Sequence, residues 1–183
     1  MANNSKTKVV TGIVRLSFEH VWEPASINGS EPKYSASLII PKSDKKTVAD
    51  IEAAVEAAIA DGIGKFGGKK PNRAVLKLPL RDGDTEREDE AYKDSFFVNA
   101  NSRTAPQIVD RAVRPILDRN EVYSGCYVRA SISLYAFNSN GNKGVACGLN
   151  NIQKVKDGEP LGGRTSATDD FTALDGADED FLS

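Results

Sequence analysis

The sequence of 183 residues predicts a mainly β fold, a small barrel or sandwich that carries one helix and long loops. Three observations support this fold class. Apolar and polar residues alternate in several separate runs, which is typical of strands that bury one face. Only one segment has the three- and four-residue apolar spacing of an amphipathic helix. Strands and helices do not alternate along the chain, which argues against a parallel βαβ sheet.

The first two strands are predicted at residues 9–18 and 34–40. The first run is rich in β-branched residues, and its predicted core-facing side chains share one parity: Val10, Val14, Leu16 and Phe18. The second run is expected to end at Pro41, which lacks the backbone N–H that strand pairing needs. Two prolines and the pair Asn28-Gly29 lie between the runs and predict a loop that contains a turn.

Residues 44–61 form the clearest predicted helix. Ser43 or Asp44 can accept hydrogen bonds from the free amide groups of its first turn. An apolar stripe at helical spacing follows, formed by Val48, Ile51, Val55 and Ile59. Gly62 stands where the helix is expected to stop.

A glycine-rich basic loop comes after the helix and carries Lys65, Lys69, Lys70 and Arg73. Residues 74–80 and 96–100 are predicted to be short strands, and residues 82–90 a charged loop. Residues 107–119 are ambiguous, because they allow a short helix that Pro115 would interrupt.

The strongest β signal is a hairpin formed by residues 126–137 and 144–155, with its turn at 139–142. The predicted core parity of the first strand is aliphatic. The opposite parity alternates rings with hydroxyls and a guanidinium, in Tyr127, Arg129, Ser131, Ser133, Tyr135 and Phe137. Stacking one base on an aromatic ring is worth about 1–3 kcal/mol, and nearby cations hold the phosphates. This face therefore predicts a surface for unpaired bases. The alternative, which the sequence leaves equally open, is a strand covered on both sides, with these rings packed under another loop.

Other residues extend the candidate interface. Arg15 lies on the outward parity of the first strand, and Phe97 and Asn99 alternate away from Val98. An Asn side chain can both donate to and accept from base edges. The four cations of the basic loop suit a groove that follows phosphates, and a solvated surface loop is the alternative. Tyr34 is a further stacking candidate that fits the core equally well.

Charge is distributed unevenly along the chain. The net charge is -2, but residues 165–183 hold six acids and no Lys or Arg. Residues 1–164 then hold 24 basic against 20 acidic residues, a net charge of +4. This split predicts a globular domain over 1–164 and a disordered acidic interaction tail over 165–183. Acids attract at long range and large apolar groups anchor, so the partner-binding residues are expected to be Asp169, Asp170, Phe171, Asp178, Glu179, Asp180 and Phe181.

Composition argues against several classes of protein. No apolar run approaches the ~20 residues that span a membrane, and the polar start is unlike a signal peptide. Cys126 and Cys147 are too few for a disulfide scaffold and are predicted to be buried thiols. His20 is the only histidine, so a histidine-rich metal site is excluded, and neither a metal nor a cofactor is expected. We therefore expect a soluble intracellular protein.

The sequence resembles the single-stranded-DNA-binding proteins of tailed phages, a family formerly catalogued as a domain of unknown function. The resemblance rests on residues 18–24, 31–42, 96–102 and 123–155. It implies a modified OB-fold, a five-stranded Greek-key barrel, which coats transient single strands during phage DNA replication, recombination and repair. It also implies a protein of the cytoplasm of the infected bacterial host, with no enzymatic activity and no cofactor.

The tail resembles the acidic C-terminal peptides of single-stranded-DNA-binding proteins generally. This resemblance implies that it recruits replication proteins such as a DNA polymerase or a helicase/primase. Asp178, Glu179, Asp180 and Phe181 match the pattern, but Leu182 and Ser183 follow Phe181 here, which favours phage-encoded partners. When no DNA is bound, the tail could compete for the same groove. A homodimer is permitted but not required.

Two other functions stay open on the sequence alone. The acids at residues 82–90 could serve a metal-dependent nuclease or recombination enzyme, although Arg81 and Arg87 interleave with them. A β-barrel adaptor whose aromatic face binds protein is the second alternative. The main prediction is a binder of single-stranded DNA with little sequence preference.

Overall fold

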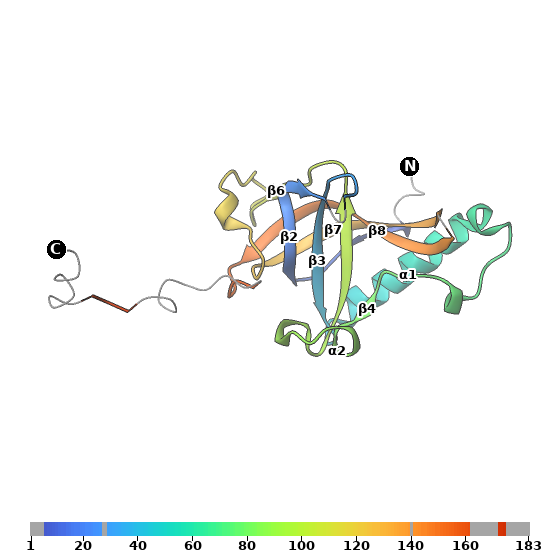
Figure 1. Ribbon diagram of the computed structural model, residues 1–183, viewed down its shortest axis with the longest axis horizontal. Helices are drawn as coiled ribbons and strands as arrows, with labels where there is room; N and C mark the ends of the chain where they lie inside the picture. The colour runs from blue at the N-terminus through green and yellow to red at the C-terminus, as the bar shows by residue number, and fades with distance from the viewer. Residues whose placement is uncertain (1–5, 27–28, 140, 162–171, 175–183) are drawn as a thin grey trace.

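A closed barrel of five strands forms the body of the protein in the computed structural model, which describes residues 6–26, 29–139, 141–161 and 172–174 (Figure 1). The barrel strands are β2 (Val14–Ala25), β3 (Lys33–Pro41), β5 (Ser95–Ser102), β7 (Tyr127–Ser139) and β8 (Asn142–Lys156). The ring runs from β2 to β3, β5, β8 and β7, and β7 then pairs with β2 again. Only the contact between β5 and β8 is parallel among these described pairs. This is the Greek-key barrel of the OB-fold, as predicted.

Three short strands extend the sheet beyond the barrel. β1 (Lys8–Val10) pairs with β7, β4 (Arg81–Asp82) pairs with β5, and β6 (Gln107–Val109) runs parallel to β8. One further short helix, α2, covers Gly83–Glu86. The four described 3₁₀ turns are Ile63–Phe66, Arg73–Val75, Glu90–Tyr92 and Arg119–Glu121.

The helix α1 (Lys45–Asp61) confirms the clearest sequence prediction and packs against β7 (Figure 1). Asp44 caps it, because its carboxylate accepts a hydrogen bond from the backbone N–H of Thr47 at 3.1 Å. The helix ends at Gly62, where a side chain would clash with β7. A Cβ on Gly62 would lie 2.2 Å from the Cβ of Ala136, so only glycine lets the helix end approach β7 this closely.

The core lies inside the barrel and under α1. The aliphatic parity of β7 is buried as predicted, in Val128, Ala130, Ile132, Leu134 and Ala136. Cys126 and Cys147 are free and buried, as predicted, and burial raises the pKa of the Cys147 thiol to about 12. Trp22 packs against this core and donates its indole N–H to the Val122 carbonyl at 2.9 Å.

The predicted strand at 9–18 is corrected by the structure. The chain leaves the ladder between β1 and β2, so the parity is not carried from one strand to the other. Val9 is therefore buried and Val10 exposed, whereas Val14 and Leu16 face the core. Phe18 is also exposed, because a bulge interrupts β2 beside it.

One further element prediction is wrong, and the ambiguous segment at residues 107–119 is resolved. Residues 74–80 do not form a strand, because Arg73–Val75 is a 3₁₀ turn and only Lys77 makes an isolated bridge, to Gly144. Residues 107–119 contain β6 followed by turns in place of a helix. Apolar spacing in such short segments does not distinguish a strand from a turn that packs one side chain.

Candidate nucleic-acid interface

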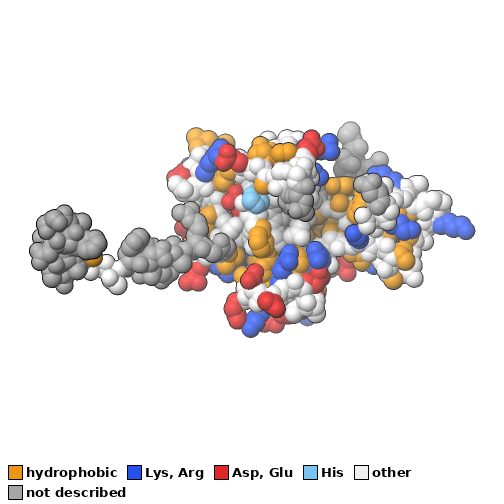
Figure 2. Space-filling view, in the orientation of Figure 1, with side chains coloured by type: hydrophobic (Ala, Val, Ile, Leu, Met, Phe, Trp, Pro, Cys, Tyr) orange, Lys and Arg blue, Asp and Glu red, His pale blue; other side chains and the backbone are white. Residues whose placement is uncertain are grey.

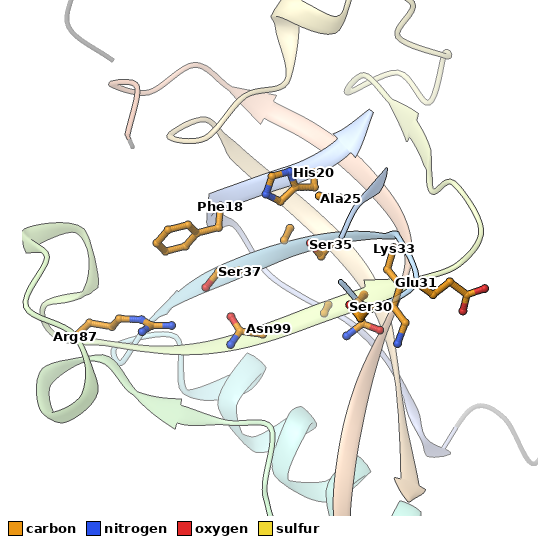
Figure 3. A pocket seen from close by; sticks show the side chains of 13 residues that line it. Phe18, His20, Ala25, Ser30, Glu31, Lys33, Ser35, Ser37, Arg87 and Asn99 are labelled. Atoms are coloured by element: carbon orange, nitrogen blue, oxygen red, sulfur yellow. The ribbon is translucent and has the colours of Figure 1, made fainter. Parts of the chain in front are cut away.

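A groove crosses the outer face of the barrel over β2, β3 and β5 (Figure 3). It has a volume of about 450 Å³ and is lined by Phe18, His20, Ala25, Ser30, Glu31, Lys33, Ser35, Ala36, Ser37, Arg87, Asn99, Ala100 and Asn101. A second hollow of about 500 Å³ adjoins it over β5, β8 and β7 and shares Lys33 and Asn101 with it. The second hollow is also lined by Ser102, Arg103, Thr104, Ser133, Tyr135, Gly148, Leu149 and Asn150. We call the two hollows together the outer groove.

The floor of the outer groove follows from strand alternation. Ser35 and Ser37 share the outward parity of β3, and they pair with Asn101 and Asn99 of β5. These side chains are short, polar and uncharged. On the face shown in Figure 2, basic and acidic side chains are interspersed and do not form one continuous basic surface. The floor of the groove thus presents hydrogen-bonding groups. The charged residues of its lining are Lys33, Arg87, Arg103 and the acid Glu31.

Phe18 reaches the groove through a β-bulge. Between the pairs Ser17↔Ser37 and His20↔Ser35, β2 has one more residue than β3. Phe18 lies in this bulge with a φ of 47°, a value that is uncommon for an aromatic residue, and its side chain is 56% exposed. Figure 3 shows the ring projecting from β2 on the side of the groove from which Arg87 enters. The bulge thus converts a position predicted for the core into an accessible ring.

Tyr135 lies on the outward face of β7, as the alternation predicts, and is 46% exposed. It lines the second hollow beside Gly148 of β8, where a Cβ would meet the Tyr135 ring at 3.7 Å. Phe137 shares this outward parity and is half-buried. Asn99 is exposed and lines the first hollow. Tyr34 is half-buried and does not line either hollow.

Phe97 requires a correction, because its ring is fully buried. Tyr92 contacts it edge-on, with ring centroids 5.2 Å apart and an interplanar angle of 88°. The guanidinium of Arg87 lies over the same ring, 4.7 Å from its centroid. A base cannot reach Phe97, so we remove it from the stacking candidates.

Tyr127, Arg15 and Arg129 lie outside the outer groove. Arg15 lies over the Tyr127 ring at 5.5 Å and donates to the carbonyls of Gly125 at 3.0 Å and Glu159 at 2.8 Å. These contacts hold the segment after β8 against the barrel. Arg129 donates to the Thr11 carbonyl at 3.1 Å and so secures the connection between β1 and β2.

Most cations of the basic loop bind the protein itself. Lys70 pairs with Glu56 at 3.1 Å, and Arg73 pairs with Glu52 at 3.2 Å and also with Glu56. The hydrogen bond from Lys70, more than that from Arg73, lowers the pKa of Glu56 below its ordinary value. Lys65 donates to the Ala136 carbonyl at 3.1 Å. Lys69 is exposed and makes no hydrogen bond or ion pair with any described residue.

The acids at residues 82–90 also bind nearby cations. Lys42 pairs with Asp82 at 2.9 Å and with Asp84 at 2.8 Å, and its hydrogen bond lowers the pKa of Asp84. Arg81 pairs with Glu86 at 2.5 Å. Within the described residues, no group of three or more His, Cys, Asp or Glu side chains is arranged to hold a metal ion.

The predicted partner-binding residues of the tail, Asp169, Asp170, Phe171, Asp178, Glu179, Asp180 and Phe181, lie outside the described residues. The predicted boundary at residue 164 lies there too. None of the helices in the described part of the chain is long and apolar enough to cross a membrane.

Sequence reasoning missed several residues that line the outer groove, among them His20, Lys33, Arg87 and Arg103. A signal for Lys33 was present, because it shares the outward parity of Ser35 and Ser37 on β3. Arg87 and Arg103 come from loops, where no periodicity indicates which way a side chain points. His20 follows the bulge, which no local pattern predicts.

Comparisons with known proteins find a family model, a sequence relative and solved structures of similar fold. The family model for the single-stranded-DNA-binding protein of Enterobacter phage Enc34 matches residues 7–182. A putative protein p50 of Acyrthosiphon pisum secondary endosymbiont phage 1 is 31% identical over 182 residues, which cover 96% of this chain and 98% of that protein.

Two solved structures share the fold. The single-stranded DNA-binding protein from bacteriophage Enc34, in complex with single-stranded DNA, is 24% identical with a TM-score of 0.75. The match covers 85% of this chain and 90% of that one. The gp2.5 single-stranded DNA-binding protein encoded by bacteriophage T7 is 14% identical with a TM-score of 0.63, over 90% of this chain and 94% of that one.

Proposed function

Because this chain belongs to the phage single-stranded-DNA-binding protein family represented by the Enc34 protein, we propose that it binds single-stranded DNA in the outer groove. The observation that carries this assignment of the site is the exposure of two rings along one groove, Phe18 in the first hollow and Tyr135 in the second. An exposed ring stacks on any base, so little sequence preference is expected.

The other groove residues suit the remaining parts of a single strand. Lys33 provides a cation for phosphates, whereas Arg103 already pairs with Glu31 at 3.0 Å. Asn99 and Asn101 provide amides that can donate to or accept from base edges. Phe137 extends the outward face of β7 past Tyr135. Lys65, Lys69, Lys70 and Arg73 are peripheral in this proposal, since most of them already bind acids or carbonyls of the protein.

In the infected bacterium, the protein would coat transient single strands during phage DNA replication, recombination and repair, without enzymatic activity. The acidic tail would recruit replication proteins and compete with DNA for the groove. The charge split supports the tail's role, because six acids on residues 165–183 complement a body with a net charge of +4.

A binding assay that compares a labelled oligothymidine strand with duplex DNA and RNA, with and without Mg²⁺, tests this function. We expect a salt-sensitive shift of the single strand, weaker binding of the duplex and intact DNA in every lane. Magnesium-dependent degradation would instead favour the nuclease alternative. Failure to shift any single strand at low salt would favour the protein-binding adaptor.

The competing tail is tested in the full-length chain by replacing its six acids with Asn or Gln. Because the tail then carries no negative charge, oligothymidine binding at low salt should tighten, and contact with replication proteins should be lost. To control for the change in net charge, a tail variant that neutralises only Glu179 and Asp180 is compared with one that neutralises the exposed pair Glu88 and Asp89, because each removes two acids of the same types. Equal affinity of the tail variant and the unmodified chain would contradict the competition.

A further inference from the structure

Arg87 enters the outer groove from the loop that follows α2, and its guanidinium points over the floor near Ser37 and Asn99 (Figure 3). Its side chain is half-buried and forms no ion pair or hydrogen bond with any described residue. The Nε–H is buried without an acceptor. A partly desolvated guanidinium without an anion is unfavourable, so an anionic ligand at this position would be strongly preferred.

Two aromatic rings pack against this guanidinium. Phe97 lies 4.7 Å and Tyr92 lies 5.6 Å from the Arg87 Cζ, measured to the ring centroids. With Ile39 they form a small apolar cluster on the outside of the barrel, separate from the main core. The Tyr92 hydroxyl donates to Ser37 on the groove floor at 3.1 Å, which ties this aromatic support to the groove itself.

Arg81 provides an internal comparison, because its guanidinium also lies over the Phe97 ring, at 5.3 Å. Arg81, however, pairs with Glu86 at 2.5 Å and does not line the groove. The same ring therefore supports one neutralised arginine and one arginine without an anion. Only the second is available to a ligand in the groove.

We infer that Arg87 is a phosphate-binding residue of the outer groove, held in place by the buried rings of Phe97 and Tyr92. This inference rests on the proposed function and adds a contact to it. A guanidinium offers a planar fork that matches two phosphate oxygens, and contact with two buried rings restricts where that fork can lie before DNA binds. Phe97 thus supports DNA binding indirectly, as a positioning residue.

Titration of full-length variants with a labelled oligothymidine strand over a series of salt concentrations tests the inference. Arg87→Ala should weaken binding about tenfold and make the log–log salt slope less negative by about 0.7, because one phosphate contact is lost. Arg87→Lys should keep the slope and lose about threefold to fivefold, because a point charge replaces the fork. Arg81→Ala, the matched control, should leave affinity and slope unchanged.

The positioning role of Phe97 is tested by a double-mutant cycle. Phe97→Leu should weaken binding in the unmodified background and have no further effect in the Arg87→Ala background, because the two residues act through one contact. A purely structural role would give the same loss in both backgrounds. Thermal unfolding of each variant separates a loss of fold from a loss of contact.

Three results would contradict the phosphate contact of Arg87. Unchanged affinity in Arg87→Ala, with normal binding by the unmodified chain, overturns the inference and leaves the proposed function intact. A loss of affinity without a change in slope would assign Arg87 to a base and overturn the phosphate contact. If the unmodified chain fails to bind the strand at low salt, the proposed function and this inference fall together.

Discussion

The outer groove and the basic loop at residues 63–73 both carry cations, but the two regions use them differently. In the basic loop, Lys70 and Arg73 bind Glu56 and Glu52 of α1, and the loop is thereby tied to the helix. In the groove, Arg103 pairs with Glu31 at 3.0 Å, but Lys33 and Arg87 form no ion pair with any described residue. The number of cations in a segment therefore says little about DNA binding until the internal partners of those cations are known.

Substitution of the exposed rings of the groove should change binding most, because the ring of the basic loop, Phe66, packs against the core. Tyr135→Ala should weaken binding to oligothymidine by roughly tenfold or more, since one stacked base contributes about 1–3 kcal/mol. Lys69→Ala in the basic loop should change the affinity less than twofold. Tyr135→Phe, which keeps the ring, is the control and should bind nearly as well as the unmodified chain. A larger loss of affinity in Lys69→Ala than in Tyr135→Ala would show that the basic loop contributes more to DNA binding than this ring of the groove.

A smaller difference is expected between one lysine of each region. Lys33→Ala should lower the affinity about threefold, as expected for one exposed charge contact. Lys70→Ala should leave DNA binding unchanged, because this lysine already pairs with Glu56. Both measurements need the same strand and salt concentration. Equal losses in the two variants would show that the ion pair with Glu56 opens to admit DNA.

The salt dependence of DNA binding by the unmodified chain tests whether the basic loop also contacts the strand. If Lys33 and Arg87, the groove cations without an internal ion pair among the described residues, each neutralise one phosphate, the log–log slope of affinity against salt should be about -1.4. If the basic loop also followed the strand, its four cations would more than double that slope. A salt titration of the binding constant distinguishes the two arrangements without any substitution.

The smallest expected effect concerns the ion pairs that hold the basic loop. The pKa of Glu56 is lowered in the folded protein, chiefly by the hydrogen bond from Lys70. Its stabilising contribution is therefore present above the unfolded pKa and lost as the pH falls through the lower folded value. Cleavage of the loop by a protease active in acid should increase over that window. Glu56→Gln should remove the pH dependence, and a variant that keeps it would point to another acid.

Local alternation predicted the hairpin, the buried face of β7 and the outward positions of Tyr135 and Asn99. It could not predict the burial of Phe97, because the residues that cover its ring, Tyr92 and Arg87, come from the connection between β4 and β5, which has no periodic pattern. It also misplaced Phe18, since a single extra residue in β2 changes which face the ring occupies. Periodicity thus assigns side chains to faces, but tertiary structure decides which faces are covered.

The parallel contact between β5 and β8 has a mechanical consequence for the barrel. One residue pair, Asn101↔Gly148, joins these strands, whereas β7 and β8 pair along nearly their whole length. The second hollow lies directly over this narrow seam, with both of these residues in its lining. A strand of DNA seated there would contact both β5 and β8 and so hold together two strands that only one ladder pair joins. Amide hydrogen exchange at Gly148 should accordingly slow when DNA binds, even though its backbone need not touch the nucleic acid.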